Sequence, residues 1–120
     1  MDILSVYATT DKQKFPCAYP DYDKKRIDTT FFADLYVAWK TSGESGIRET
    51  YNKCHTQFKD NVKYYTEFIG ALNRMLWMTY EQMGDCAISR LFNELWSKAN
   101  GYGIDHFDGD DLDFMYMVLD

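Results

Sequence analysis

With 120 residues, of which 46% are hydrophobic and 18% aromatic, the chain has ample apolar side chains for one packed domain and too many for a disordered segment. Its net charge of −6 arises at one end, because residues 1–104 carry 13 acidic and 13 basic side chains whereas residues 105–120 carry six acids and no Lys or Arg. This distribution argues against direct binding of nucleic acid, since phosphate contacts need clustered basic side chains. The acidic end is instead expected to bind a basic protein surface or a cation.

Cysteine content and hydropathy predict a cytoplasmic protein. Three cysteines at wide spacings, with no C-x-x-C pair, argue against a disulfide framework. Asp2 stands where a secretory signal would carry basic residues, so no export signal is expected. The longest apolar helical stretch, Val62–Met83, contains four charged side chains and is therefore not predicted to span a membrane.

The N-terminal part differs in pattern from the rest of the chain. Residues 1–27 contain both prolines and are predicted to be extended or irregular, with a candidate short strand at Ile3–Ala8. From about Asp28 the apolar spacing is helical and predicts a first helix that stops at Gly43. A second helix is expected from Ser45 to about Asp60.

Two further helices are predicted in the middle of the chain. Val62–Met83 carries two apolar stripes, which indicates a long central helix covered on two sides. Gly70 in its interior predicts a close approach of another backbone at that point. The next helix is expected to have Asp85 as its N-cap, to stop at Asn100–Gly101 and to pack antiparallel to its predecessor. The predicted fold is a single all-α domain over residues 1–120: a compact bundle of four to five helices over 28–120, with an arm at 1–27.

The acidic segment near the C-terminus admits more than one interpretation. An EF-hand loop beginning at Asp108 would place Leu112 at a ligand position and Asp113 where glycine is required, so that motif fails. A loosely held cation remains an alternative. The favoured interpretation is the start of a last helix, whose dipole the carboxylates stabilise and whose buried side is Leu112, Met115, Tyr116 and Leu119.

Cysteine and histidine offer little support for catalysis. Cys54 and His55 are neighbours on a predicted helix and point about 100° apart, so they do not pair with each other. A cysteine nucleophile would need His106 or another distant group, and Cys17, Cys54 and Cys86 lack the short spacing of zinc ligands. Cys54 and Cys86 are expected to be buried as small apolar residues. We expect no catalytic residue, no metal and no cofactor.

Aromatic residues give the strongest indication of function. Ten Tyr, eight Phe and three Trp suit either a core of large side chains or an interaction surface, because Tyr and Trp bury much area with little loss of entropy. Those in loops or at the margins of the helical stripes are the candidates for partial exposure: Tyr19, Tyr22, Trp39, Trp77 and Tyr102. The candidate partner-binding surface joins them to the acids Asp105, Asp108, Asp110, Asp111 and Asp113.

The segments "NKCHTQFKDNVKYYTEFIGALNRMLWMTYE" and "LFNELWSKANGYGID" resemble small helical proteins of unknown function that conjugative transposons and phages of gut Bacteroidales carry. The resemblance covers about the last two-thirds of the chain and rests on its patterned aromatics. It implies a cytoplasmic accessory protein of a mobile genetic element and transfers no active-site residue.

Three functional hypotheses follow. The first is a non-enzymatic regulatory protein that binds a protein partner with a basic surface. The second is an anti-defence inhibitor, of the anti-restriction or anti-CRISPR type, that blocks a nucleic-acid-binding site by acidic mimicry. The third is an enzyme that depends on cysteine or a metal. A homodimer is compatible with all three, because two apolar stripes on one helix can be buried within one chain or across a dimer axis.

Overall fold

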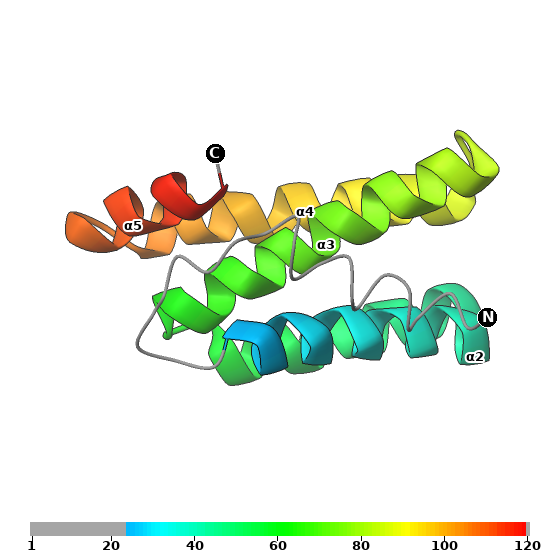
Figure 1. Cartoon of the computed structure of the whole chain (residues 1–120), viewed down its shortest axis with the longest axis horizontal. Coiled ribbons are helices and arrows are strands. Elements are labelled where there is room, and N and C mark those ends of the chain that lie inside the picture. Colours follow the sequence, from blue (N-terminus) through cyan, green and yellow to red (C-terminus); the bar gives the residue numbers. More distant parts are fainter. Residues whose placement is uncertain (1–23, 120) are drawn as a thin grey trace.

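The computed structural model describes the backbone of residues 24–119 and the side chains of residues 31–119 (Figure 1). Within this part the chain is all-helical and has no strand, which confirms the predicted all-α class. The helices are α2 (Lys24–Phe58), α3 (Val62–Met83), α4 (Ala87–His106) and α5 (Asp110–Leu119). The candidate strand and the arm up to residue 23 lie outside the described residues.

The first described helix, α2, is a helical hairpin. At Gly43 the backbone has φ 61° and ψ −140°, a conformation that favours glycine, and the helix reverses there. The rings of Phe31 and Phe58 lie 5.3 Å apart, so the two arms run antiparallel. The predicted stop at Gly43 is thereby confirmed. The predicted start near Asp28 is wrong by four residues, because Lys24–Ile27 contains no helix breaker and continues the first arm.

The two arms of α2 approach most closely at Gly46. A Cβ atom at this position would lie 2.7 Å from the carbonyl oxygen of Ala38 and 2.8 Å from the Cβ of Ser42. The close approach expected at Gly70 is wrong, since the nearest described atom to a Cβ there is a methyl group of Leu119 at 4.0 Å. The contact at Gly46 follows from the reversal of the chain, which helical spacing does not reveal.

Replacing Gly46 with Ala is expected to destabilise the protein by about 2 kcal/mol, because the added methyl group meets backbone rather than a flexible side chain. Gly101→Ala is the matched control. No described atom lies within 4 Å of a Cβ at Gly101, so the change should stabilise α4 by about 0.5–1 kcal/mol. Urea unfolding followed by circular dichroism measures both, and equal effects would contradict the close approach of the two arms.

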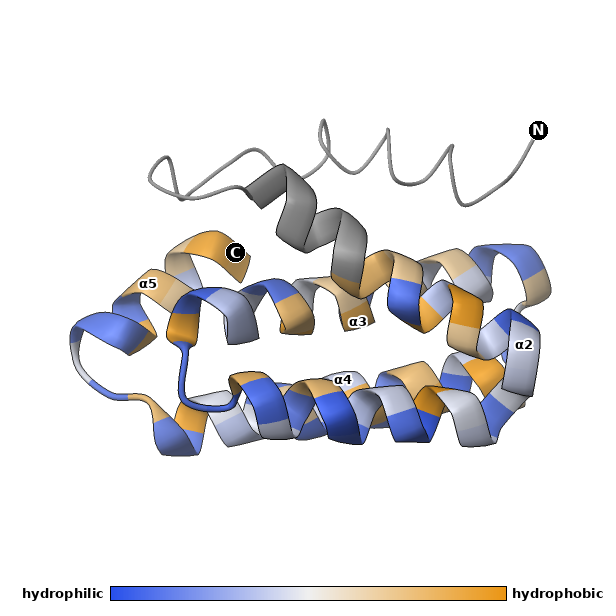
Figure 2. Ribbon diagram, turned by 90° about the horizontal axis from the view of Figure 1, so that it is seen from below, coloured by the Kyte–Doolittle hydropathy of each residue, from blue (hydrophilic) through white to orange (hydrophobic). Residues whose placement is uncertain are grey.

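The core forms around α3, which packs against α2, α4 and α5. Asn61 caps its N-terminus, where the side-chain oxygen accepts a hydrogen bond of 3.2 Å from the Tyr64 N–H. Apolar residues recur along α3 and α4 on the sides that face the other helices (Figure 2). The aromatic and aliphatic side chains of α3 with no exposed surface are Tyr65, Phe68, Ile69, Leu72 and Met75. The radius of gyration, 13.6 Å, is that of a compact chain of this length.

Helix α4 runs antiparallel to α3, as predicted, but both of its ends differ from the prediction (Figure 1). Its N-cap is Cys86 rather than Asp85, and it continues past Gly101 to His106. The Phe107 N–H then closes the helix on the Gly103 carbonyl at 3.0 Å. A Cβ at Gly103 would lie 2.9 Å from the sulfur of Met115, so this glycine makes room for α5 instead of ending α4.

The last helix, α5, begins with acidic residues as the sequence indicates. Asp110, Asp111 and Asp113 lie in its first turn, where their charges interact favourably with the amide dipole. Met115 is fully buried, and Leu112 and Leu119 pack partly buried against the core. The expectation that Tyr116 is buried is wrong, since 43% of it is exposed.

Candidate functional site: an aromatic cleft between α3 and α4

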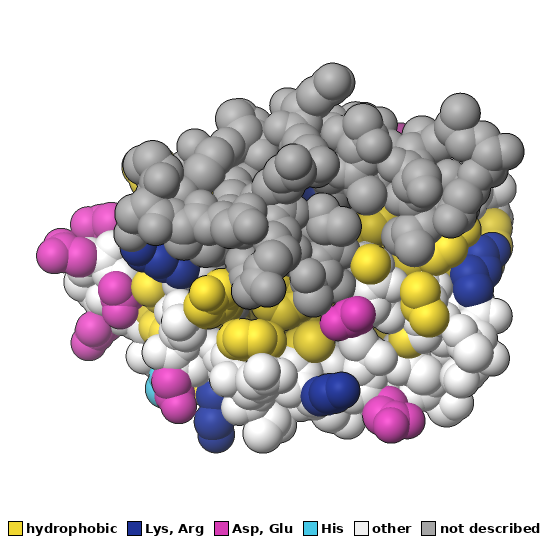
Figure 3. Space-filling model, turned by 60° about the horizontal axis from the view of Figure 1, so that its bottom comes forward, with side chains coloured by type: hydrophobic (Ala, Val, Ile, Leu, Met, Phe, Trp, Pro, Cys, Tyr) yellow, Lys and Arg dark blue, Asp and Glu magenta, His cyan; other side chains and the backbone are white. Residues whose placement is uncertain are grey.

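The five acids predicted to face a partner are all exposed. Asp105 is near the end of α4, Asp108 is in the following turn, and the other three begin α5. Acidic side chains gather at this end of the molecule (Figure 3). Their arrangement is local, because the end of α4, the turn that follows it and the first turn of α5 supply all of them.

The predicted aromatic surface residues lie in different environments. Trp77 is 55% exposed, whereas Trp39 and Tyr102 are partly buried against the core. The ammonium group of Lys40 lies 4.0 Å from the centre of the Trp39 ring and covers it. Tyr102 stacks on His106, with ring centroids 4.8 Å apart. Tyr19 and Tyr22 lie outside the described residues.

The structure does not bring Trp77 and the acidic residues into one surface. Trp77 is near the turn that joins α3 to α4, and the acids lie at or beyond the opposite end of α4, a helix of twenty residues (Figure 1). A helix of that length spans about 30 Å. A small partner therefore contacts one of these surfaces or the other.

A cleft of about 420 Å³ lies beside Trp77, between the last half of α3 and the first half of α4. Both helices and the turn between them contribute to its walls. Its lining residues are Asn73, Leu76, Trp77, Tyr80, Asp85, Ser89, Arg90, Asn93 and Trp96. Three aromatic rings and two amide side chains in one cleft are typical of a recognition site.

Trp77 and Tyr80 present two rings at nearly a right angle. Their planes meet at 81° and their centroids are 6.1 Å apart. Tyr80 is 49% exposed, and Trp96 contributes a third, partly buried ring from α4. Sequence analysis missed Tyr80, although its position three residues after Trp77 places both rings on one side of a helix.

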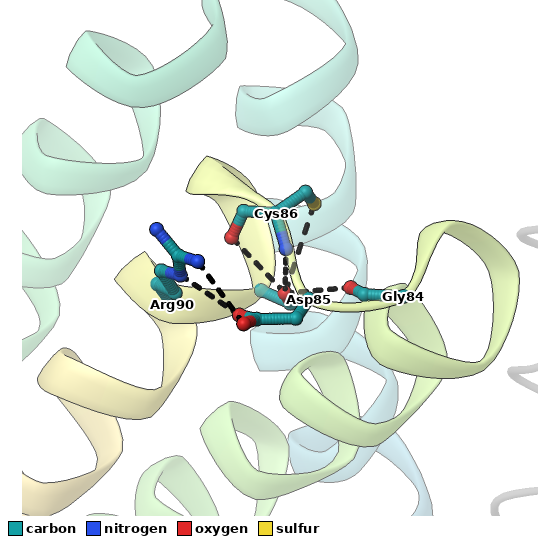
Figure 4. A network of polar contacts seen from close by, with 5 residues as sticks. Gly84, Asp85, Cys86 and Arg90 are labelled. Carbon is teal, nitrogen blue, oxygen red and sulfur yellow. Dashed lines mark hydrogen bonds and ion pairs between the residues drawn. The ribbon is translucent and has the colours of Figure 1, made fainter.

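Polar contacts at the α3–α4 turn stabilise the part of the cleft wall that the aromatic rings do not form (Figure 4). The Arg90 guanidinium donates two hydrogen bonds to the Asp85 carboxylate, at 2.8 and 3.0 Å. The Ser89 hydroxyl accepts a hydrogen bond from the Cys86 N–H at 3.0 Å and lies 2.9 Å from the carbonyl oxygen of Gly84, to which it donates. These contacts fix the angle at which α4 leaves the turn.

A second groove, of about 650 Å³, lies between the two arms of α2. Its Phe31 and Phe58 rings pack edge to face against each other, and Phe31 is only 3% exposed. The groove therefore offers no exposed aromatic ring, in contrast to the cleft at Trp77.

The two histidines do not form a nucleophilic pair with a cysteine. His55 Nδ1 lies 2.7 Å from the Tyr65 hydroxyl, and His106 Nε2 lies 2.8 Å from an Asp60 oxygen. Burial raises the pKa of Tyr65, and burial also lowers the pKa of His55, so near neutral pH the contact joins two uncharged groups. The hydrogen bond between His55 and Tyr65 thus joins α2 to α3.

The two described cysteines differ in exposure and acidity. Burial raises the pKa of the Cys54 thiol to about 11. Hydrogen bonds from the Ser89 backbone and side chain lower the pKa of Cys86, which is partly exposed at the start of α4. The expectation that Cys86 is buried is wrong, because its position as N-cap leaves the thiol at the surface.

This difference predicts selective alkylation. In a Cys17→Ser variant at pH 7.5, iodoacetamide should modify Cys86 at least about tenfold faster than Cys54, because the thiolate is the reactive form. Mass spectrometry of the digested protein at successive times gives both rates. Equal rates would mean that the two arms of α2 open readily and expose Cys54.

Among the residues that the structure describes, no three His, Cys, Asp or Glu side chains are grouped so that they could hold a metal ion. No helix between residues 24 and 119 combines the length and apolar character needed to cross a bilayer. Comparison with protein-family models, curated proteins and solved structures found no match to this chain.

Proposed function

We propose that this chain is a non-enzymatic interaction protein that binds a protein partner through the cleft between α3 and α4. The observation that carries the proposal is the exposure of two adjacent large rings, Trp77 at 55% and Tyr80 at 49%, in the wall of that cleft. Tyr and Trp are the residues most enriched where binding energy concentrates in protein interfaces. Exposed apolar rings grouped on a concave surface are costly unless a partner covers them.

The biological setting of the proposal rests on the resemblance to small proteins of Bacteroidales mobile elements. We propose that the chain acts in the cytoplasm as a regulatory accessory protein of such an element. A role of this kind needs an interface and does not need a reactive centre.

Partner capture by three forms of the full chain tests the proposal: the wild type, a Trp77→Ala/Tyr80→Ala variant, and a variant with Asp108, Asp110, Asp111 and Asp113 changed to Asn. Each is used with a lysate of the organism that carries the gene, at low and moderate salt. The retained protein is identified, purified and titrated against all three forms. We expect the ring variant to lose binding and the acid variant to retain most of it.

A second candidate function is an acidic inhibitor of a nucleic-acid-binding protein, and the five exposed Asp residues near α5 favour it. A mimic of duplex DNA requires carboxylates spread along a face at phosphate-like spacing, whereas these are confined to one end. Competition between this chain and DNA for the purified partner distinguishes the two functions. Competition that the four-Asp variant loses would support mimicry and would count against the cleft.

A further inference from the structure

The cleft contains hydrogen-bonding groups that have no partner among the residues that the structure describes. Within the described residues, no hydrogen bond involves the side-chain amides of Asn73 and Asn93 or the indole N–H groups of Trp77 and Trp96. These four groups lie in the same cleft as three aromatic rings. A ligand that complements the cleft must combine apolar surface with hydrogen-bond acceptors.

The spacing of these groups defines a short binding track. Asn73, Trp77 and Tyr80 follow one another at intervals of four and three residues, so they share one side of α3. Asn93 and Trp96 have a similar interval on α4, which runs antiparallel. From Asn73 to Tyr80 the helix rises about 10 Å, which equals three to four residues of a polyproline II strand.

An extended peptide fits this cleft better than a helix or an added strand does. A partner helix satisfies its own backbone hydrogen bonds and requires a continuous apolar groove, whereas amides and an ion pair interrupt this one. Strand addition requires a sheet edge, and residues 24–119 form no sheet. A polyproline II segment leaves its carbonyl groups free for the amide and indole donors and places proline rings on aromatic faces.

Charge around the cleft favours a basic ligand. Glu81 follows Trp77 by one turn of α3 and is exposed, and Asp85 lines the cleft. Arg90 balances only one of these two carboxylates, through its ion pair with Asp85. A Lys or Arg beside the prolines would meet the remaining negative charge.

We propose that the partner presents an extended, proline-containing segment with an adjacent basic residue, and that Trp77, Tyr80 and Trp96 receive its apolar rings while Asn73 and Asn93 bond its carbonyl groups. This inference rests on the proposed function and names the chemistry of the partner.

Calorimetric titration of the full chain with three synthetic decapeptides tests the inference. The first carries four prolines at P-x-x-P spacing and two arginines, the second has alanine in place of every proline, and the third has glutamate in place of both arginines. We expect the first peptide to bind at least tenfold more tightly than the second. The third should bind more weakly than the first, by a factor that shrinks as salt is added.

The protein variant that addresses the amides is Asn73→Ala/Asn93→Ala, which should weaken binding of the first peptide about tenfold because two hydrogen bonds are lost. Asn93 is exposed, so Asn93→Ala alone should leave the fold intact. This single variant replaces the double variant if the double variant unfolds. Equal binding of the proline and alanine peptides, no binding of the proline peptide at millimolar concentration, or unchanged binding by both Asn variants would overturn the inference.

The two proposals fail in different ways. If a captured partner needs Trp77 and Tyr80 but the proline peptide does not bind, the inference is wrong and the cleft remains an interface. If the partner binds the wild type and the Trp77→Ala/Tyr80→Ala variant equally, the proposed function is wrong.

Discussion

Replacing Phe68 with Ala is expected to lower the free energy of unfolding by about 3–5 kcal/mol. The ring is fully buried on α3 and contacts Phe31, Tyr51 and Tyr65, with centroid separations of 5.7, 5.4 and 5.6 Å. The substitution removes the ring from a place where both arms of α2 meet α3, and the surrounding rings are too large to close the cavity fully. Urea unfolding followed by near-ultraviolet circular dichroism measures the loss.

Met117→Ala is the control for this experiment, because Met117 is 64% exposed on α5 and should change stability by less than about 0.5 kcal/mol. If Phe68→Ala lowered the free energy of unfolding no more than Met117→Ala does, the described packing of α2 on α3 would be contradicted.

Replacing Trp77 with Ala is expected to weaken binding of the captured partner about 30-fold or more, the loss that follows removal of a large aromatic residue at the centre of an interface. The fold should be unaffected in circular dichroism, since more than half of the Trp77 side chain is exposed. Tyr80→Ala should act in the same direction, because its ring forms the adjacent wall at 81° to the indole. Titration of the purified partner into each variant measures the effect.

Met117→Ala serves again as the matched control, since it removes an equally exposed apolar side chain on a different helix. Trp77→Phe should retain part of the affinity, because it keeps an aromatic ring in place. If Met117→Ala weakened binding of the partner as much as Trp77→Ala does, the partner would be binding exposed apolar surface in general and not the cleft.

Much of the helical architecture could be predicted from local pattern. Apolar spacing located Val62–Met83, and Gly43 marked a reversal that its positive φ explains. The acids at the start of α5 were understood correctly as a favourable helix start, because dipole interactions act within one turn. Each of these features depends on residues that are close together in the sequence.

The features that were missed depend on tertiary contacts. Gly46 and Gly103 are close-contact positions only because the second arm of α2 folds back on the first and α5 packs on α4, and no local pattern shows either event. Gly101 is a plausible helix stop by itself, yet packing carries α4 on to His106. Tertiary packing outweighs the cost of a helical glycine, which is about 1 kcal/mol.

The candidate surface was predicted in part. Trp77 is exposed, and Trp39 and Tyr102 are partly exposed while they pack against the core, which agrees with the expected partial exposure. The separation of Trp77 from the acidic residues was beyond sequence reasoning, because it depends on the direction in which α4 leaves the turn. Tyr80 could have been found from its three-residue spacing to Trp77, had exposure at the end of α3 been considered.

The central claim is that a partner contacts the cleft, and nuclear magnetic resonance of the ¹⁵N-labelled chain tests it most directly. The three tryptophans give separate indole N–H signals, of which Trp77 and Trp96 report on the cleft and Trp39 serves as the internal control. On addition of the purified partner, the account predicts shifts at Trp77, Trp96 and the backbone amides around them, with little change at Trp39 or residues 105–113. Shifts confined to residues 105–113, with both cleft indoles unchanged, would contradict it.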